Sequence, residues 1–146
     1  MTDLDMDLFF QSLYGLNASK LPSKHTVQAW LHAQSPASRV LCSTSSTGKW
    51  CIFRSAQDVD AMWQRIENAC TSQQLDVAKV STHKTSQYRD SHVICVYTPD
   101  FEDKDDVRRV REILRELGCI EELGYKRDVD TRNGVYGTED EWTYRI

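Results

Sequence analysis

A chain of 146 residues, 40% hydrophobic and 27% charged, has the size and composition of one ordinary globular domain. The formal net charge of −4 excludes general nucleic-acid binding through a global positive field, so we expect no DNA partner, and any RNA site must be local. No apolar run approaches the roughly 20 residues of a membrane span. Residues 1–5 contain two aspartates and lack the basic residues with which a secretory signal begins. These features predict a cytoplasmic protein, with the nucleus as a second location, and no membrane partner.

The first quarter of the chain predicts two helices. Apolar residues recur at helical spacing in residues 5–16. Ser23 can cap a second helix that carries Trp30 and Leu31 on its apolar face and ends before a proline. We therefore expect residues 1–36 to form an N-terminal helical segment that packs on the body of a single domain, residues 1–146.

The body, residues 37–146, predicts short strands that alternate with helices. Two β-prone runs, residues 39–42 and 49–54, flank a polar segment of hairpin-loop length. Residues 55–74 follow as the clearest amphipathic helix, with Ser55 as its cap. The apolar stripe of this helix consists of Val59, Met62, Trp63, Ile66, Ala69 and Cys70.

The same order then repeats. Residues 77–82 and 92–98 predict an antiparallel strand pair joined by a polar loop. Residues 103–117 follow as a second amphipathic helix, with acidic residues in its first turn and Gly118 as its C-terminal stop.

The chain closes with two further predicted strands, residues 119–126 and 135–146, on either side of the turn dipeptide Asn133-Gly134. Short hairpins imply antiparallel pairing, and helices at this spacing would cover one face of the sheet. The sequence therefore predicts an α+β protein, a curved antiparallel sheet with helices packed on one face and a concave, available face opposite.

Three stretches resemble the family of the basophilic leukaemia-expressed protein: residues 78–82, residues 93–101 with the helix that follows, and residues 125–136. The resemblance implies the fold of the mRNA cap-binding translation initiation factor 4E. Cap-binding factors of this fold hold the methylated guanine between two loop tryptophans, with an acidic residue beside the second. Here residues 43–48 contain no aromatic residue, whereas the later loop offers the ring of Tyr88 and the carboxylate of Asp90.

Two stretches of mixed chemistry are the candidate ligand surfaces. Residues 79–82 combine an ammonium group with hydroxyl donors, which suits a phosphate, and residues 125–128 set an aromatic ring among charges, which suits a nucleotide. A solvated strand edge and a solvated loop are the alternative interpretations. A tryptophan can stack on a base, with core packing as the alternative, and Trp50 beside a loop is the candidate here.

These observations lead to a non-enzymatic, monomeric binding module that recognises single-stranded RNA or a nucleotide on the concave sheet face. The candidate ligand-binding residues are Trp50, Lys79, Ser81, Thr82, Tyr88, Tyr125, Lys126 and Asp128. The alternative is a protein–protein interaction adaptor that uses the outer faces of helices 55–74 and 103–117.

Other chemistry finds little support in the sequence. The five cysteines include no C-x-x-C pair and fall mostly in predicted core positions, which indicates reduced structural thiols. The histidines lack metal-ligand spacing, and Thr47-Gly48-Lys49 lacks the upstream glycine of a phosphate-binding loop. We expect no metal, no cofactor and no catalytic residue.

Overall fold

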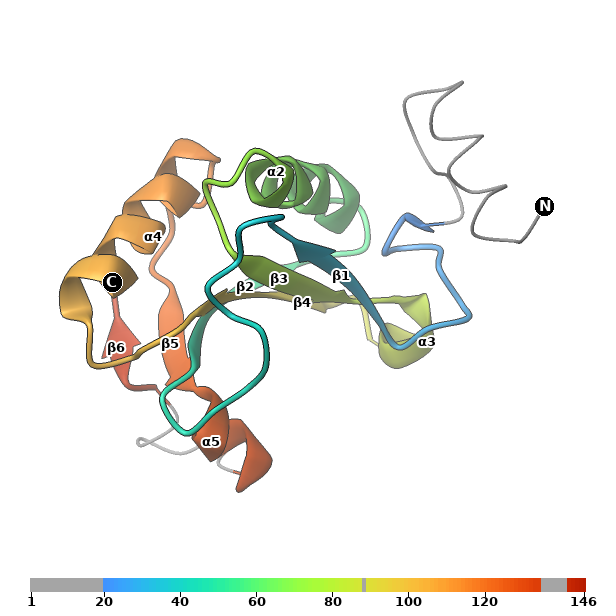
Figure 1. Cartoon of the computed structure of the whole chain (residues 1–146). Coiled ribbons are helices and arrows are strands. Elements are labelled where there is room, and N and C mark those ends of the chain that lie inside the picture. The colour runs from blue at the N-terminus through green and yellow to red at the C-terminus, as the bar shows by residue number, and fades with distance from the viewer. Residues whose placement is uncertain (1–19, 88, 135–141) are drawn as a thin grey trace.

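The computed structural model describes residues 20–87, 89–134 and 142–146, and a six-stranded sheet lies at the centre of this part of the chain (Figure 1). The strand order is β1-β3-β4-β2-β5-β6, and every neighbouring pair is antiparallel. The strands are β1 (Trp30–Gln34), β2 (Gly48–Arg54), β3 (Val77–Ser81), β4 (His92–Thr98), β5 (Gly124–Arg127) and β6 (Tyr144–Arg145). The predicted α+β architecture with a curved antiparallel sheet is confirmed.

Two long helices, α2 (Val59–Thr71) and α4 (Lys104–Glu116), cover one face of the sheet (Figure 1). The short helices α3 (His83–Ser86) and α5 (Asp128–Arg132) lie away from that layer. The buried residues of α2 are the predicted stripe, Val59, Met62, Trp63, Ile66, Ala69 and Cys70. Within the described residues, no helix is long and apolar enough to cross a membrane.

The predicted boundaries of α4 agree with the structure because local chemistry sets them. The Asp103 carboxylate accepts a hydrogen bond from the backbone N of Asp106, which satisfies a free donor of the first turn. Gly118 follows the helix with a φ of +109°, a conformation that favours glycine. The cap predicted for α2 was wrong, because that helix begins after Asp58 and not at Ser55.

The helix predicted from Ser23 to the end of the N-terminal segment was wrong. Residues Trp30–Gln34 form β1, an edge strand that pairs with β3. Leu31 and Ala33 alternate into the core, so the period of two outweighs the helical spacing over this short run. The predicted helix at residues 5–16 lies outside the described residues.

The predicted strand at residues 39–42 is also absent from the sheet, so the predicted first hairpin was wrong. Arg39 instead binds Asp76, with 2.7 Å between Nη2 and Oδ2, and Asp106, with 3.2 Å between Nη2 and Oδ1. These contacts hold the segment against the start of β3 and the first turn of α4. The next strand, β2, pairs with β4 and β5 in the middle of the sheet.

The end of the chain is less extended than predicted. The strand predicted for residues 119–126 is the shorter β5, and α5 separates it from the turn at Asn133-Gly134. Of the strand predicted for residues 135–146, the structure describes β6, and residues 135–141 lie outside the described residues.

Candidate functional site

The face of the sheet opposite α2 and α4, here called the open face, presents two neighbouring rows of side chains that cross four strands. The strand registers define the two rows. The first row consists of Val77, Tyr97, Lys49 and Lys126, which lie opposite one another on neighbouring strands. The second row consists of Lys79, Cys95, Cys51 and Gly124. Residues in register on antiparallel neighbours share a face, so both rows lie together.

A cavity of about 500 Å³ lies on the open face between the sheet, α5 and the segment that precedes β2. This volume is within the roughly 300–1,000 Å³ of ordinary small-molecule sites. The polar and aromatic side chains that line it include His32, Lys49, Lys79, Tyr97, Asp128 and Arg132.

A buried ion pair forms one wall of this cavity. The Nζ atom of Lys49 lies 2.8 Å from Oδ1 of Asp128, and the Ser43 hydroxyl donates to the same carboxylate. Burial alone would raise the pKa of Asp128, but the hydrogen bonds from Lys49 and Ser43 outweigh it, so the pKa is lowered. The backbone N of Asp128 also donates to the carbonyl of Thr47 at 2.9 Å, so this pair joins α5 to the segment before β2.

Lys79 lies on the opposite side of the cavity. Its Nζ atom lies 4.1 Å from the centre of the Trp30 ring, a cation–π contact, and no described carboxylate forms an ion pair with it. Burial lowers the pKa of His32, and the charge of Lys79 lowers it further, so this imidazole is neutral at pH 7.

The cavity is positively charged although the chain is acidic. Its lining holds three permanent cations, Lys49, Lys79 and Arg132, against one carboxylate, Asp128. The Oγ1 atom of Thr131 in the same lining is buried and has no hydrogen-bond partner among the described residues. A net positive lining with an unsatisfied hydroxyl suits a polar anionic ligand.

The predicted site residues divide between the cavity and the scaffold. Lys79 and Asp128 line the cavity, and Lys126 lies in the first row of the open face but is 3% exposed. Ser81 accepts a hydrogen bond from the backbone N of Val93 at 2.9 Å, and the Thr82 hydroxyl donates to the carbonyl of Gln28 at 2.5 Å. Both hydroxyls hold strand ends together.

Tyr88, the remaining candidate of that region, lies outside the described residues.

The prediction that Trp50 and Tyr125 edge the concave face was wrong. Both are fully buried beneath the helices, and their rings meet edge to face with 5.1 Å between centroids. The Trp50 indole N–H donates to the carbonyl of Val107 at 3.0 Å, and the Tyr125 hydroxyl lies 2.6 Å from that of Thr98. The period of two along a strand puts these rings on the face opposite Lys49 and Lys126.

Lys49 and Tyr97 line the cavity but were not among the predicted ligand-binding residues. The signal was alternation, because Trp50 and Ile52 are apolar and belong to the core, so Lys49 must point to the other face. Gly124, the β5 member of the second row, lies against the ring of Trp142, and a Cβ atom at residue 124 would be 2.3 Å from that ring.

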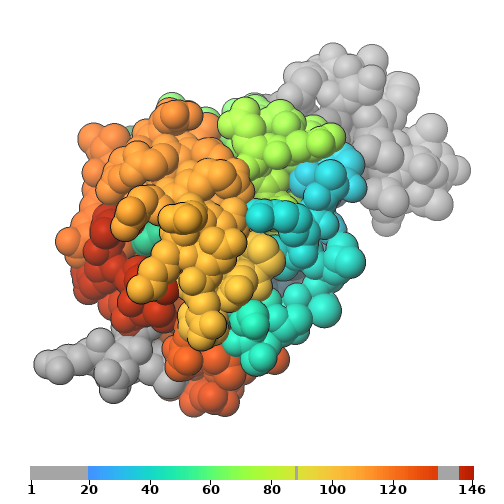
Figure 2. All heavy atoms as spheres, turned by 60° about the vertical axis from the view of Figure 1, so that its left-hand side comes forward, coloured from blue at the N-terminus to red at the C-terminus, as the bar shows by residue number. Residues whose placement is uncertain are grey.

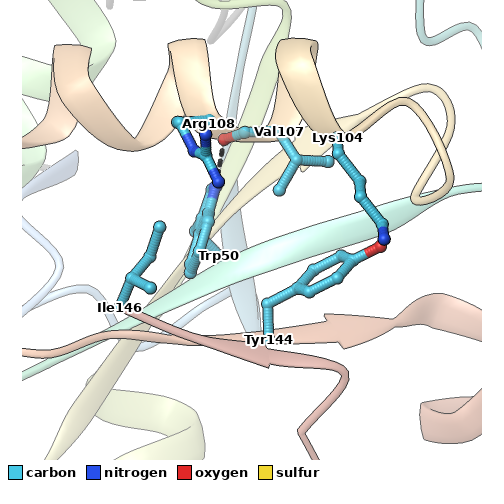
Figure 3. Close-up of a pocket in the computed structure, with 6 residues that line it drawn as sticks. All are labelled: Trp50, Lys104, Val107, Arg108, Tyr144 and Ile146. Carbon is cyan, nitrogen blue, oxygen red and sulfur yellow. Dashed lines mark hydrogen bonds between the residues drawn. The ribbon is translucent and has the colours of Figure 1, made fainter.

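A second, smaller pocket of about 230 Å³ lies on the helix-covered side (Figure 3). The side chains of Trp50, Tyr144 and Ile146 rise from the sheet toward α4, and Lys104 and Arg108 come from that helix. Figure 2 shows α4 across the front of the molecule, with the C-terminal strand beside it.

The model of the family described as basophilic leukemia-expressed protein Bles03 matches residues 24–134 of this chain. The matched region includes all of the elements that surround the cavity, from β1 to α5.

Solved structures of eIF4E proteins have the same fold. Schistosome eIF4E, complexed with m7GpppA and 4E-BP, gives a TM-score of 0.55 at 18% identity, over 69% of this chain and 59% of that one. C. elegans eIF4E-3, with the 4E-binding protein Mextli and a cap analog, gives 0.63 at 15% identity, over 95% and 80%. Ascaris suum eIF4E-3 with an m2,2,7G cap gives 0.61 at 18% identity, over 95% and 79%. This chain thus spans less than two thirds of the schistosome protein.

Proposed function

Given that this chain belongs to the family of the basophilic leukemia-expressed protein Bles03 and has the eIF4E fold, we propose that it binds a nucleotide or single-stranded RNA in the open-face cavity. The observation that supports this most directly is the excess of cations around a partly buried aromatic ring, Tyr97, in a protein of net charge −4.

Each part of the cavity suits a part of such a ligand. Lys79 and Arg132 provide donors for a phosphate, and the hydroxyl of Thr131 adds a neutral donor. Tyr97 provides a ring on which a base can stack, an interaction of about 1–3 kcal/mol. Lys49, already neutralised by Asp128, contributes more to the shape of the wall than to ligand charge.

The proposal includes binding without catalysis. Asp128 is the one carboxylate among the described residues that line the cavity. Its pKa is lowered, and it already accepts hydrogen bonds from Lys49 and Ser43. These properties suit a structural anion and not a general base near pH 7. The cations are suited to hold charge in place. We therefore propose a recognition module and not an enzyme.

A tryptophan fluorescence titration tests the proposal, because Trp30 lies beside Lys79 on the open face. The ligands are GTP, a methylated cap analogue and a short mixed-sequence RNA at low salt. Saturable quenching is expected in the wild type, and Lys79→Glu is expected to weaken binding by about tenfold or more, equivalent to at least 1.4 kcal/mol.

Arg108→Glu is the matched control, since it makes the same charge reversal on exposed α4, across the sheet from the cavity. Trp30→Phe should remove the fluorescence signal while calorimetry still detects binding. Equal affinity of wild type and Lys79→Glu, or equal losses in Lys79→Glu and Arg108→Glu, would refute the cavity assignment. No binding of any of the three ligands would refute nucleotide recognition itself.

A protein partner on the helix-covered side is the second candidate function. Two of the eIF4E structures hold 4E-BP or Mextli, and in this chain the pocket beside α4 combines apolar walls with the cations Lys104 and Arg108 at its rim. A partner captured from extracts after nuclease treatment, and lost with Arg108→Glu but retained with Lys79→Glu, would support it. The reverse pattern would place the partner on the open face.

A further inference from the structure

Two cysteines face each other in the middle of the open face. Cys51 on β2 and Cys95 on β4 are register partners in an antiparallel pair, so both side chains project from the same side of adjacent strands. The Cα atoms of such partners lie about 4.5 or 5.5 Å apart, and both distances fall within the roughly 4.4–6.8 Å that a disulfide spans. The backbone spacing of the two residues therefore permits a disulfide between them.

The surroundings of this pair favour a thiolate. The neighbouring thiol of Cys51 lowers the pKa of Cys95, and the charges of Lys49 and Lys79 lower it further, whereas Cys95 and burial raise the pKa of Cys51. Lys79 is the register partner of Cys95 on the other side, so a cation and a thiol flank the same sulfur.

The other described cysteines differ in kind. Burial raises the pKa of Cys70 to about 12 and that of Cys119 to about 11, and both lie in the core beneath the helices. Cys42 is exposed, in the segment before β2. Among the residues that the structure describes, only Cys51 and Cys95 have both a second thiol in register and neighbouring cations.

We propose that Cys51 and Cys95 form an oxidative modification site, at which a small hydroperoxide converts the two thiols reversibly into a disulfide between β2 and β4. The inference does not depend on the proposed ligand. The cavity reaches Lys49, Lys79 and Tyr97, the neighbours of the pair on three sides, and leaves the cysteines themselves 6% and 4% exposed. Because so little of either cysteine is exposed, we take a small oxidant, hydrogen peroxide, as the co-reactant.

The reaction balances in two steps. The Cys95 thiolate attacks one oxygen of hydrogen peroxide, the O–O bond breaks, and the departing hydroxide takes up a proton to leave as water. The Cys51 sulfur then attacks the sulfenic acid of Cys95, the S–O bond breaks, and the hydroxide leaves as water with the proton of the Cys51 thiol. Two thiols lose two electrons in total, and one hydrogen peroxide becomes two waters.

The test uses the full chain with Cys42→Ser, which keeps four of the five cysteines and removes the exposed thiol. The folded protein is treated with hydrogen peroxide, quenched, unfolded with an alkylating reagent and mapped by mass spectrometry. We expect the count of free thiols to fall from four to two, a mass loss of two hydrogens, and one crosslinked peptide pair that contains Cys51 and Cys95. Dithiothreitol should restore all four thiols.

Cys95→Ser and Cys70→Ser are matched single-atom controls in the same background. Cys95→Ser should abolish the crosslink, whereas Cys70→Ser should leave its yield unchanged, and thermal unfolding confirms that each variant is folded. The proposal is overturned if Cys51 and Cys95 remain thiols at peroxide concentrations that oxidise Cys42 in the wild type. It is also overturned if the crosslink forms only in the unfolded chain.

Discussion

Replacing Asp128 by asparagine is expected to lower the free energy of unfolding by about 3 kcal/mol at pH 7. Lys49 is 4% exposed and Asp128 is 8% exposed, so the substitution leaves a buried ammonium without its counterion. Removal of one partner of a buried pair costs roughly 3–5 kcal/mol. The lower end of this energy range applies here because the asparagine side chain still offers an oxygen to Lys49 and Ser43.

Urea unfolding of four proteins measures this effect: the wild type, Asp128→Asn, Lys49→Met and the double variant. The double variant should lose less stability than the sum of the single losses, because neither charge remains unpaired. Asp130→Asn is the control in the same helix. Its partner Arg127 has a side chain that is 40% exposed, so the expected cost is below about 1 kcal/mol.

The pH dependence provides an independent check of the pair. The lowered pKa of Asp128 means that its contribution is complete above the ordinary aspartate pKa of about 3.9 and is lost as the pH falls through the folded-state pKa. The stability difference between wild type and Asp128→Asn should therefore shrink below about pH 4. A cost below about 1 kcal/mol at pH 7, or a difference that stays constant into acid, would refute the reasoning.

Three further substitutions test the packing and the helix boundaries by urea unfolding. Gly48→Ala should destabilise the protein by about 1–3 kcal/mol, because its Cβ atom would lie 2.1 Å from the Tyr125 hydroxyl oxygen, and a neutral effect would contradict that close approach. Asp103→Ala should cost about 1 kcal/mol by removing the cap on the N–H of Asp106, whereas Asp103→Asn should cost less, and equal costs would argue against the cap. Leu114→Ala should cost about 2–5 kcal/mol because Leu114 is fully buried on the core-facing side of α4, and a loss below about 1 kcal/mol would indicate a loosely packed core.

The long helices follow from the sequence because their information is local. The stripe from Val59 to Cys70 repeats over more than three turns, and the acidic cap at Asp103 with Gly118 after the last turn delimits α4. Each of these signals acts within a few residues, so no knowledge of the sheet is needed to read it.

The short strands were harder to assign because a local pattern over so few residues carries little information. Residues 30–34 offer two buried positions, Leu31 and Ala33, and a run with so few of them is a weak signal for a period of two. Residues 39–42 have strand composition, yet the ion pairs of Arg39 with Asp76 and Asp106 hold them outside the sheet. Those partners lie 37 and 67 residues away, beyond the reach of a local pattern.

The candidate site shows the same division between local and tertiary information. The amino-acid sequence determined that Lys79 and Asp128 belong to a polar surface, that α2 and α4 bury apolar stripes, and that one sheet face remains uncovered. The tertiary structure alone decided that Asp128 meets Lys49 from 79 residues away and that Cys51 faces Cys95. Strand register is the physical reason, since a shift by one residue moves every side chain to the other face, and pairing between distant strands sets that register.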